Sequence, residues 1–176
     1  EMTSSLVGSE MCIRDRYRTV WGQDFLMDTL RGLTFKLSVP SFYQVNPAQT
    51  EVLYGKALEF AALTGEETVL DLYCGIGTIT LCMAGSAKRV IGAEIVPAAI
   101  RDAEENAVRN GIGNAEFFCG DAADVAARLE SEGLRPHVVT VDPPRKGLFS
   151  REILDGAPPR DHHCPTGGCP EEFPVG

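Results

Sequence analysis

From residue 65 onward, short apolar runs alternate with segments whose apolar positions recur every three or four residues. Continuous apolar runs are typical of strands buried in a sheet, and the longer spacing is typical of helices packed on it. Strands joined through helices run parallel with right-handed crossovers. The pattern therefore predicts an α/β fold with strands at Thr68–Leu72, Arg89–Glu94, Ala115–Cys119 and Val138–Val141, and helices at Thr78–Gly85, Pro97–Asn110 and Ala122–Leu129.

The helix that Pro97 opens has an apolar and a polar face. Its expected core positions are Ala99, Ala103 and Ala107, with Ile100 and Val108 at the margin. Its expected exposed positions are Arg101, Asp102, Glu104, Glu105 and Arg109. Glu105 and Arg109 are spaced for an i,i+4 ion pair.

Residues 17–64 predict strands and a helix that lead into this sheet. Strand composition is found at Tyr17–Trp21 and at Leu33–Val39, and apolar and polar positions alternate in the second run. Asn46 is a good N-cap, and Pro47 suits the first helical position. The helix is expected to end before Gly65 and to bury Val52, Leu53, Ala57, Leu58, Ala61 and Ala62. It is a packing element, or else Phe42-Tyr43-Gln44 just ahead of it lines a ligand cleft.

The glycine turn after the first parallel strand is Asp71-Leu72-Tyr73-Cys74-Gly75-Ile76-Gly77-Thr78. Gly75 and Gly77 allow a sharp backbone turn and close approach of a ligand at a helix start. The dinucleotide fingerprint needs a third glycine three residues after Gly77, where Thr80 stands. The turn therefore predicts a nucleotide-type site that differs from a standard NAD motif.

Acidic residues follow the next three strands, at the sheet edge where open α/β folds bind ligands. Glu94, 17 positions after Gly77, can accept both ribose hydroxyls of a nucleoside. Asp121 meets an adenine amino group or caps the helix that follows it. Asp142 precedes Pro143-Pro144-Arg145-Lys146 in a stiff loop that clamps a planar base and phosphate, or forms an ordinary proline turn.

The composition is that of a globular chain of 176 residues with a net charge of −9. This charge argues against a large basic nucleic-acid face within the chain, because phosphate neutralisation needs clustered Lys and Arg. Cys74, Cys82 and Cys119 stand in apolar runs, where buried reduced thiols are expected. A cytosolic (cytoplasmic) location follows, and no apolar run reaches the length of a membrane span.

Both ends of the chain break the pattern. We interpret residues 1–16 as a non-native segment, with a mobile basic arm as the alternative. Residues 151–176 are interpreted as a disordered or non-native tail. His162, His163, Cys164 and Cys169 carry zinc-binding atoms, but their spacing fits no common zinc finger. We therefore assign no metal site, and the domain division is 1–16, 17–64, 65–150 and 151–176.

Four segments together resemble the RNA (uracil-C5)-methyltransferase family, most of all its bacterial 23S ribosomal RNA enzymes. They are Ser41–Pro47, Asp71–Thr78, Gly92–Ile100 and Val141–Gly147, within a resemblance that covers about residues 17–150. The resemblance implies a truncated class I S-adenosylmethionine (SAM)-dependent methyltransferase sheet of the Rossmann-like type. It also implies an RNA partner, and that SAM is bound around the Gly75–Gly77 turn by Gln44, Tyr73, Glu94 and Asp142, with Thr78 and Asp121 as weaker members.

In that family a cysteine thiolate adds to uracil C6, C5 then takes the methyl group, and a base removes the C5 proton. The family's nucleophile motif, Ser-Cys-Asn-Pro, and its C-terminal glutamate are not found in this sequence. We assign no catalytic residue, and we expect the chain to be an internal piece with little or no methyl transfer of its own. The alternatives are a methyltransferase for a base amino group and a non-catalytic nucleotide-binding module.

Overall fold

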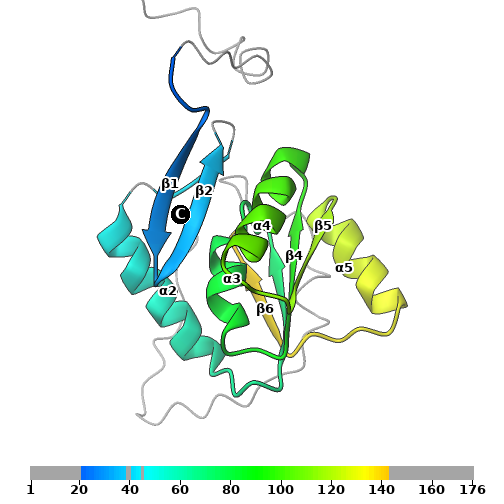
Figure 1. Cartoon of the computed structure of the whole chain (residues 1–176). Helices are drawn as coiled ribbons and strands as arrows, with labels where there is room; N and C mark the ends of the chain where they lie inside the picture. Colours follow the sequence, from blue (N-terminus) through cyan, green and yellow to red (C-terminus); the bar gives the residue numbers. More distant parts are fainter. Residues whose placement is uncertain (1–20, 39–40, 45, 143–176) are drawn as a thin grey trace, which may run out of the picture.

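The computed structural model describes residues 21–38, 41–44 and 46–142 (Figure 1). Its centre is a parallel four-stranded sheet in the order β5-β4-β3-β6. The strands are β3 (Thr68–Leu72), β4 (Arg89–Glu94), β5 (Ala115–Cys119) and β6 (Val138–Val141), and the connecting helices are α3 (Thr78–Ala84), α4 (Pro97–Arg109) and α5 (Ala122–Ser131). The predicted α/β fold is confirmed, and the predicted helix ends differ from these by only one or two residues.

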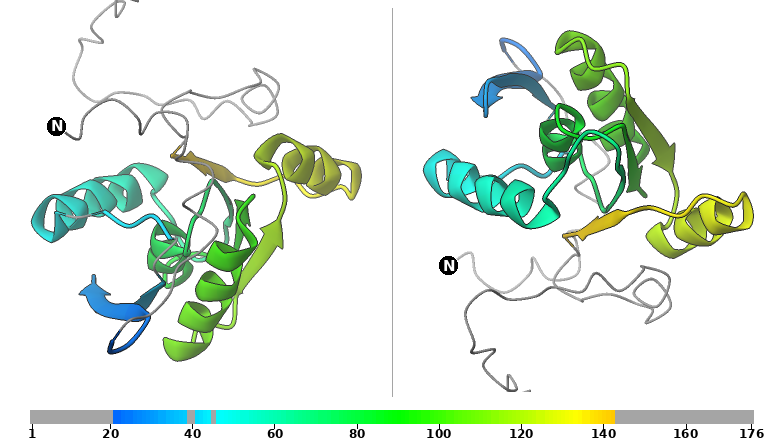
Figure 2. Two further views of the ribbon diagram at one scale, coloured as in Figure 1. Left: turned by 90° about the horizontal axis from the view of Figure 1, so that it is seen from above. Right: turned by 90° about the horizontal axis from the view of Figure 1, so that it is seen from below.

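Helices cover both faces of the central strands (Figure 2). Leu70, Leu72, Ile91 and Ala93 pack against α5, in a cluster with Val125 and Leu129. The alternate residues Val69 and Val90 face the other way and pack against Met83 and Ala84 of α3. Strands that are buried on both faces are apolar throughout, which is why these runs could be recognised.

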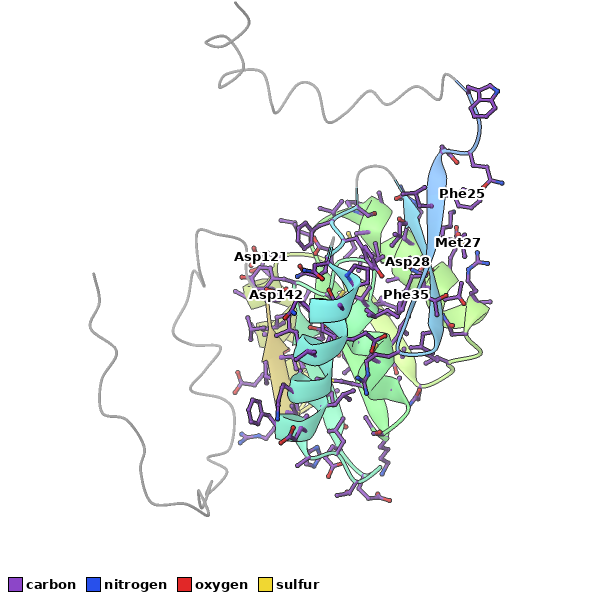
Figure 3. All side chains as sticks on the ribbon, turned by 90° about the vertical axis from the view of Figure 1, so that its left-hand side faces the viewer. Phe25, Met27, Asp28, Phe35, Asp121 and Asp142 are labelled. Carbon is purple, nitrogen blue, oxygen red and sulfur yellow. The ribbon has the colours of Figure 1, made fainter. Side chains whose placement is uncertain are left out.

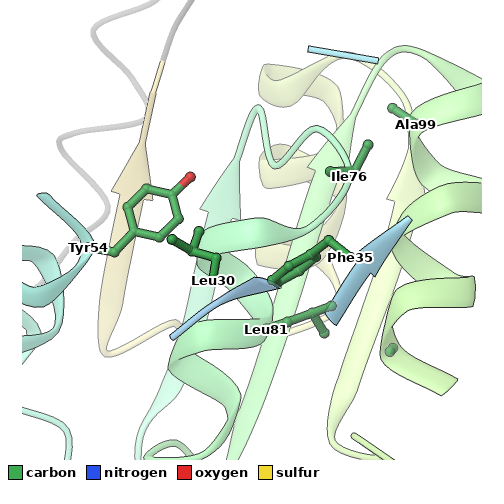
Figure 4. Packing of buried hydrophobic residues seen from close by; sticks show 7 residues of the cluster. Leu30, Phe35, Tyr54, Ile76, Leu81 and Ala99 are labelled. Carbon is green, nitrogen blue, oxygen red and sulfur yellow. The ribbon is translucent and has the colours of Figure 1, made fainter. Parts of the chain in front are cut away.

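An antiparallel hairpin of β1 (Phe25–Leu30) and β2 (Leu33–Ser38) lies beside this layer, next to α2 (Pro47–Ala61). Its buried side chains Leu30 and Phe35 join Tyr54 of α2 with Ile76, Leu81 and Ala99 of the α/β layer (Figure 4). The hairpin and α2 are thereby attached to the elements that follow β3 and β4.

The sequence pattern missed the first strand that the structure describes, and the strand predicted at Tyr17–Trp21 can be compared only at Trp21. Trp21 lies outside any strand and is 93% exposed, while residues 17–20 lie outside the described residues. The observed strand, β1, has apolar residues at 25, 26, 27 and 30, and Leu26 and Met27 are exposed. Without alternation, the pattern carried no strand periodicity to recognise. The second predicted strand is confirmed as β2.

Helix α2 begins as predicted, and of its predicted core positions Ala57, Leu58 and Ala61 pack against the core while the others are exposed. Asn46 caps it, because its Oδ1 accepts a hydrogen bond from the Gln49 backbone N–H at 3.2 Å. The fully buried positions are Thr50, Tyr54 and Ala61, whereas Val52 and Leu53 are exposed. The expected stripe was therefore only partly right, because apolar residues occur on several sides of this helix.

Helix α4 holds the free edge of β2 through side-chain amides. Asn110 Oδ1 accepts from Thr34 N–H and its Nδ2 donates to Thr34 O, both at 2.8 Å. Asn106 Oδ1 accepts from Lys36 N–H at 2.7 Å, and its Nδ2 donates to Lys36 O at 3.2 Å and to Ile76 O at 3.4 Å. The two amides replace a neighbouring strand along this edge of β2.

Asp102 continues the same row and corrects the predicted exposed face of α4. Its carboxylate is buried and accepts hydrogen bonds from the hydroxyls of Ser38 and Ser41. Glu105 pairs with Lys36 at 2.8 Å rather than forming the predicted pair with Arg109. The bond to Glu105 raises the pKa of Lys36. The expected core positions Ala99, Ala103 and Ala107 are buried, but Val108 is 81% exposed.

The cysteines differ in burial. Cys74 is buried and Cys82 half-buried, and both are free thiols, as expected. Cys119 is also free but exposed, contrary to expectation, because β5 is an edge strand. Among the described residues, no helix is long and apolar enough to cross a bilayer. The interpretations of segments 1–16 and 151–176, with the zinc alternative, lie outside the described residues.

Candidate functional site

The loop after β3 takes left-handed backbone conformations at three residues. Their φ angles are 67° at Tyr73, 55° at Gly75 and 80° at Gly77, and Gly77 is the N-cap of α3. Left-handed geometry is strained for tyrosine, and such residues concentrate at ligand sites. Cys74 N–H donates to Ala93 O of β4 at 3.0 Å, which anchors the loop. A Cβ at Gly75 would meet nothing within 4 Å, so a ligand can approach the backbone there.

Gly77 offers no comparable room. A Cβ there would lie 3.1 Å from the Phe117 ring and 3.2 Å from Ala103 Cβ. We expect Gly77→Ala to lower the free energy of unfolding by about 2 kcal/mol, through left-handed strain and crowding. Gly85→Ala is the matched control, because Gly85 ends the same helix at φ −67° with open space around it. Urea unfolding followed by circular dichroism measures both, and equal stabilities would contradict the expectation.

Glu94 ends β4 and ties the glycine loop to the start of α4. Its Oε2 accepts from Gly75 N–H at 3.2 Å, and its Oε1 accepts from Val96 N–H at 3.0 Å. The carboxylate is half-buried. Each oxygen keeps acceptor capacity beyond one hydrogen bond, so Glu94 can still accept from the hydroxyls of a ribose.

Asp71 lies beneath this loop, fully buried within β3. Its Oδ2 accepts from the Thr80 hydroxyl of α3, and its Oδ1 accepts from the Thr140 hydroxyl of β6 at 2.9 Å. Burial raises the pKa of Asp71 to about 7, against the lowering effect of these two hydrogen bonds. The side chain therefore links the start of α3 to the strand that leads into Asp142.

Thr78 and Tyr54 meet at the other side of the loop. The Tyr54 hydroxyl lies 2.8 Å from Thr78 Oγ1. Burial raises the pKa of Tyr54, and the nearby carboxylates of Asp71 and Asp142 raise it further. The phenol is therefore neutral, and it lies within electrostatic reach of the carboxyl ends of β3 and β6.

The remaining predicted residues lie as follows. Asp121 is exposed after β5 and caps α5, since its Oδ1 accepts from Ala123 N–H at 2.9 Å. Asp142 is exposed after β6, and Figure 3 shows it at the same end of the molecule as Asp121. Gln44 is half-buried, two residues before Asn46. The prediction that Gln44 contacts a ligand stays a prediction. The proline loop after Asp142 lies outside the described residues.

The structure thus gathers Tyr73, Gly75, Gly77, Thr78 and Glu94 around the ends of β3 and β4. Asp121 and Asp142 follow the flanking strands β5 and β6 at the same edge. Sequence reasoning missed Tyr54, Thr80 and Thr140. Their partners stand 24, 9 and 69 positions away along the chain, so no local pattern marks them.

Comparison with known proteins finds relatives in sequence and in fold. Residues 63–134 match the family model described as "Methyltransferase domain". An uncharacterized RNA methyltransferase of Halalkalibacterium halodurans is 54% identical over 83% of this chain and 32% of its own length. One from Staphylococcus aureus (strain MSSA476) is 55% identical over 81% of this chain and 32% of its own length. This chain therefore spans only 32% of the length of these curated relatives.

Among solved structures, the Pyrococcus abyssi tRNA (uracil-54, C5)-methyltransferase in complex with S-adenosyl-L-homocysteine has a TM-score of 0.61 and 28% identity to this chain. The match covers 77% of this chain and 32% of that one. The fold is that of the class I SAM-dependent methyltransferases, and SAM is the cofactor that the fold and the matches imply. The open backbone at Gly75 beside the half-buried Glu94 fits the adenosyl part of that cofactor.

Proposed function

We propose that this chain provides the SAM-binding part of an RNA (uracil-C5)-methyltransferase that acts on ribosomal RNA in the cytosol. The observation that carries the proposal is the Glu94 carboxylate, held by Gly75 N–H beside a left-handed glycine loop. The names of the relatives as RNA methyltransferases support an RNA substrate, and the Pyrococcus neighbour supports uracil C5. That neighbour is named for tRNA, so both RNA classes belong in the assay.

Each residue of the site has a part in the proposal. Glu94 accepts from the ribose hydroxyls, and the Tyr73–Gly77 loop supports the rest of the adenosyl group. Asp121 has one acceptor oxygen engaged by Ala123 N–H and can use the other for the adenine amino group. Gln44 and Asp142 complete the pocket. SAM supplies an electrophilic methyl group on a sulfonium, and the protein's task is to hold it towards the base.

Cys74 is poorly suited to be the nucleophile, although it stands in the loop. Burial is the main cause that raises the pKa of its thiol well above the ordinary value. Burial also raises the pKa of Cys82 to about 11. Addition to uracil needs the thiolate, so these two thiols are structural. We assign no catalytic residue among the described residues.

The cofactor site is tested by Glu94→Ala. We expect SAM affinity to fall by about 2 kcal/mol, roughly 30-fold in Kd, because hydrogen bonds from the ribose lose a charged acceptor. Glu104→Ala is the control, since Glu104 is exposed on α4 and also loses one carboxylate. Isothermal titration calorimetry with SAM, and with NAD for comparison, measures both. Equal affinity in the two variants, or tighter binding of NAD, would refute the SAM site.

The uracil assignment needs a chemical readout. Methyl transfer to C5 displaces the hydrogen at that position, whereas methylation of an amino group leaves it in place. We expect a full-length relative to release tritium from ribosomal RNA that contains 5-tritiated uridine. Methyl incorporation without tritium release would support methylation of an amino group instead.

A further inference from the structure

Tyr54 carries a hydroxyl that packing alone does not require. Its ring is buried in the cluster with Leu30, Phe35, Ile76 and Leu81 (Figure 4), where phenylalanine would fill the same space. A buried hydroxyl costs free energy unless it is hydrogen-bonded. Its partner is the Thr78 hydroxyl at 2.8 Å. The hydroxyl therefore contributes a hydrogen bond to Thr78, while the ring contributes to the core.

Thr78 is placed where small movements matter to the loop. It is the first residue of α3 and directly follows the left-handed Gly77. Its partner Tyr54 lies on α2, which starts at Pro47, three residues after Gln44. The Tyr54–Thr78 hydrogen bond thus connects the helix that follows Gln44 to the start of α3. The glycine loop just before α3 is also bound by Glu94, through Gly75 N–H.

The hydrogen bond with Tyr54 occupies one hydrogen-bonding position of the Thr78 hydroxyl, whichever of the two oxygens donates. A threonine hydroxyl has one proton and can rotate about its C–O bond. The hydrogen bond to the phenol holds the Thr78 oxygen in place and leaves its remaining hydrogen-bonding positions for a ligand. A group restrained before the ligand arrives loses less entropy on binding.

We propose that Tyr54 is a positioning residue for SAM, which acts through Thr78 and the glycine loop. The inference rests on the proposed function. It adds a residue outside the strand-end motifs and predicts that the two hydroxyls act as one unit in cofactor binding.

The test is a double-mutant cycle on SAM affinity in the 176-residue chain. Tyr54→Phe removes only the phenol oxygen, and Thr78→Val replaces the threonine hydroxyl with a methyl group of similar size. We expect each to raise the Kd for SAM by roughly fivefold, the scale of one hydrogen bond. The double variant is expected to bind no more weakly than the weaker single variant, because both changes remove one interaction.

Thr50→Val is the matched control for loss of a hydroxyl. Thr50 is buried one turn earlier on α2, and its hydroxyl donates to Asn46 O at 2.8 Å, within the helix start. We expect this variant to lose stability and to bind SAM within twofold of the wild type. Thermal unfolding by circular dichroism confirms that every variant is folded before titration.

The outcomes separate the two proposals. If the wild type binds SAM and Glu94→Ala weakens binding while Tyr54→Phe does not, the role of Tyr54 is refuted and the SAM site stands. Additive effects of Tyr54→Phe and Thr78→Val also refute it. If the wild type fails to bind SAM, the proposed function is refuted.

Discussion

Asp71→Asn is expected to make the protein increasingly more stable than the wild type as the pH rises. Burial raises the pKa of Asp71 to about 7 in the folded state, from 3.8 for an unperturbed carboxyl. A carboxyl whose folded pKa is raised stabilises the fold below its unfolded pKa, and this contribution is lost as the pH rises through the folded value. The whole difference corresponds to about 4 kcal/mol.

Between pH 5 and pH 8.5, the advantage of Asp71→Asn should grow by about 3 kcal/mol. The amide keeps the contacts, because its oxygen accepts from Thr140 and its nitrogen donates to the Thr80 hydroxyl, which can rotate to accept. Urea unfolding across this pH range measures the difference. Asp124→Asn, which removes an exposed carboxylate from α5, corrects for net charge. A constant difference between Asp71→Asn and the wild type would contradict the expectation.

Asn106→Ala is expected to cost about 3 kcal/mol of stability, through three unpaired backbone groups and a small cavity. Asn106 is completely buried, and it serves Lys36 N–H, Lys36 O and Ile76 O. Alanine removes the partners of all three groups, of which Ile76 O is buried and the two Lys36 groups are partly buried. The loss also weakens the attachment of the hairpin to α4, which Asn110 and Asp102 still hold through Thr34 and Ser38.

Asn110→Ala is the matched control for Asn106→Ala. Asn110 makes the same paired contact with Thr34 but is only half-buried. Water can replace its amide, so a loss of about 1 kcal/mol is expected. Urea unfolding of both variants measures the contrast. Similar losses would mean that burial does not decide the effect.

The fold could be predicted where burial is uniform along an element. The runs at Val69–Leu72 and Val90–Ala93 are buried on both faces, and apart from Asp71 their residues are apolar or glycine, which shows the burial directly. Strand β1 could not be predicted, because exposed Leu26 and Met27 break any alternation. Asp102 was misplaced for a related reason. A carboxylate is buried only where partners arrive from elsewhere, and the hydroxyl of Ser38 stands 64 positions away.

Some residues of the site could also be predicted from the sequence, and others could not. Strand ends mark Glu94, Asp121 and Asp142, because parallel topology places successive carboxyl ends at one edge. The capping alternative for Asp121 is realised in the structure, and cofactor contact there stays a prediction. The roles of Tyr54 and Thr140 depend on tertiary packing. A sequence pattern gives no direction for a side chain whose partner lies on another element.

The α4 side chains that bind β2 are four residues apart, and their partners on β2 are two residues apart, so the two spacings nearly match. Four helical residues advance about 6.0 Å, whereas two strand residues advance about 6.8 Å, so the two scales drift apart with every step. At Asn110 both hydrogen bonds measure 2.8 Å, and at Asn106 they measure 2.7 and 3.2 Å. At Asp102 the partners are the rotatable hydroxyls of Ser38 and Ser41 instead of backbone groups. Because the two repeats differ, a longer hairpin would accumulate a larger mismatch with a straight helix, and flexible side chains such as serine could take up part of it.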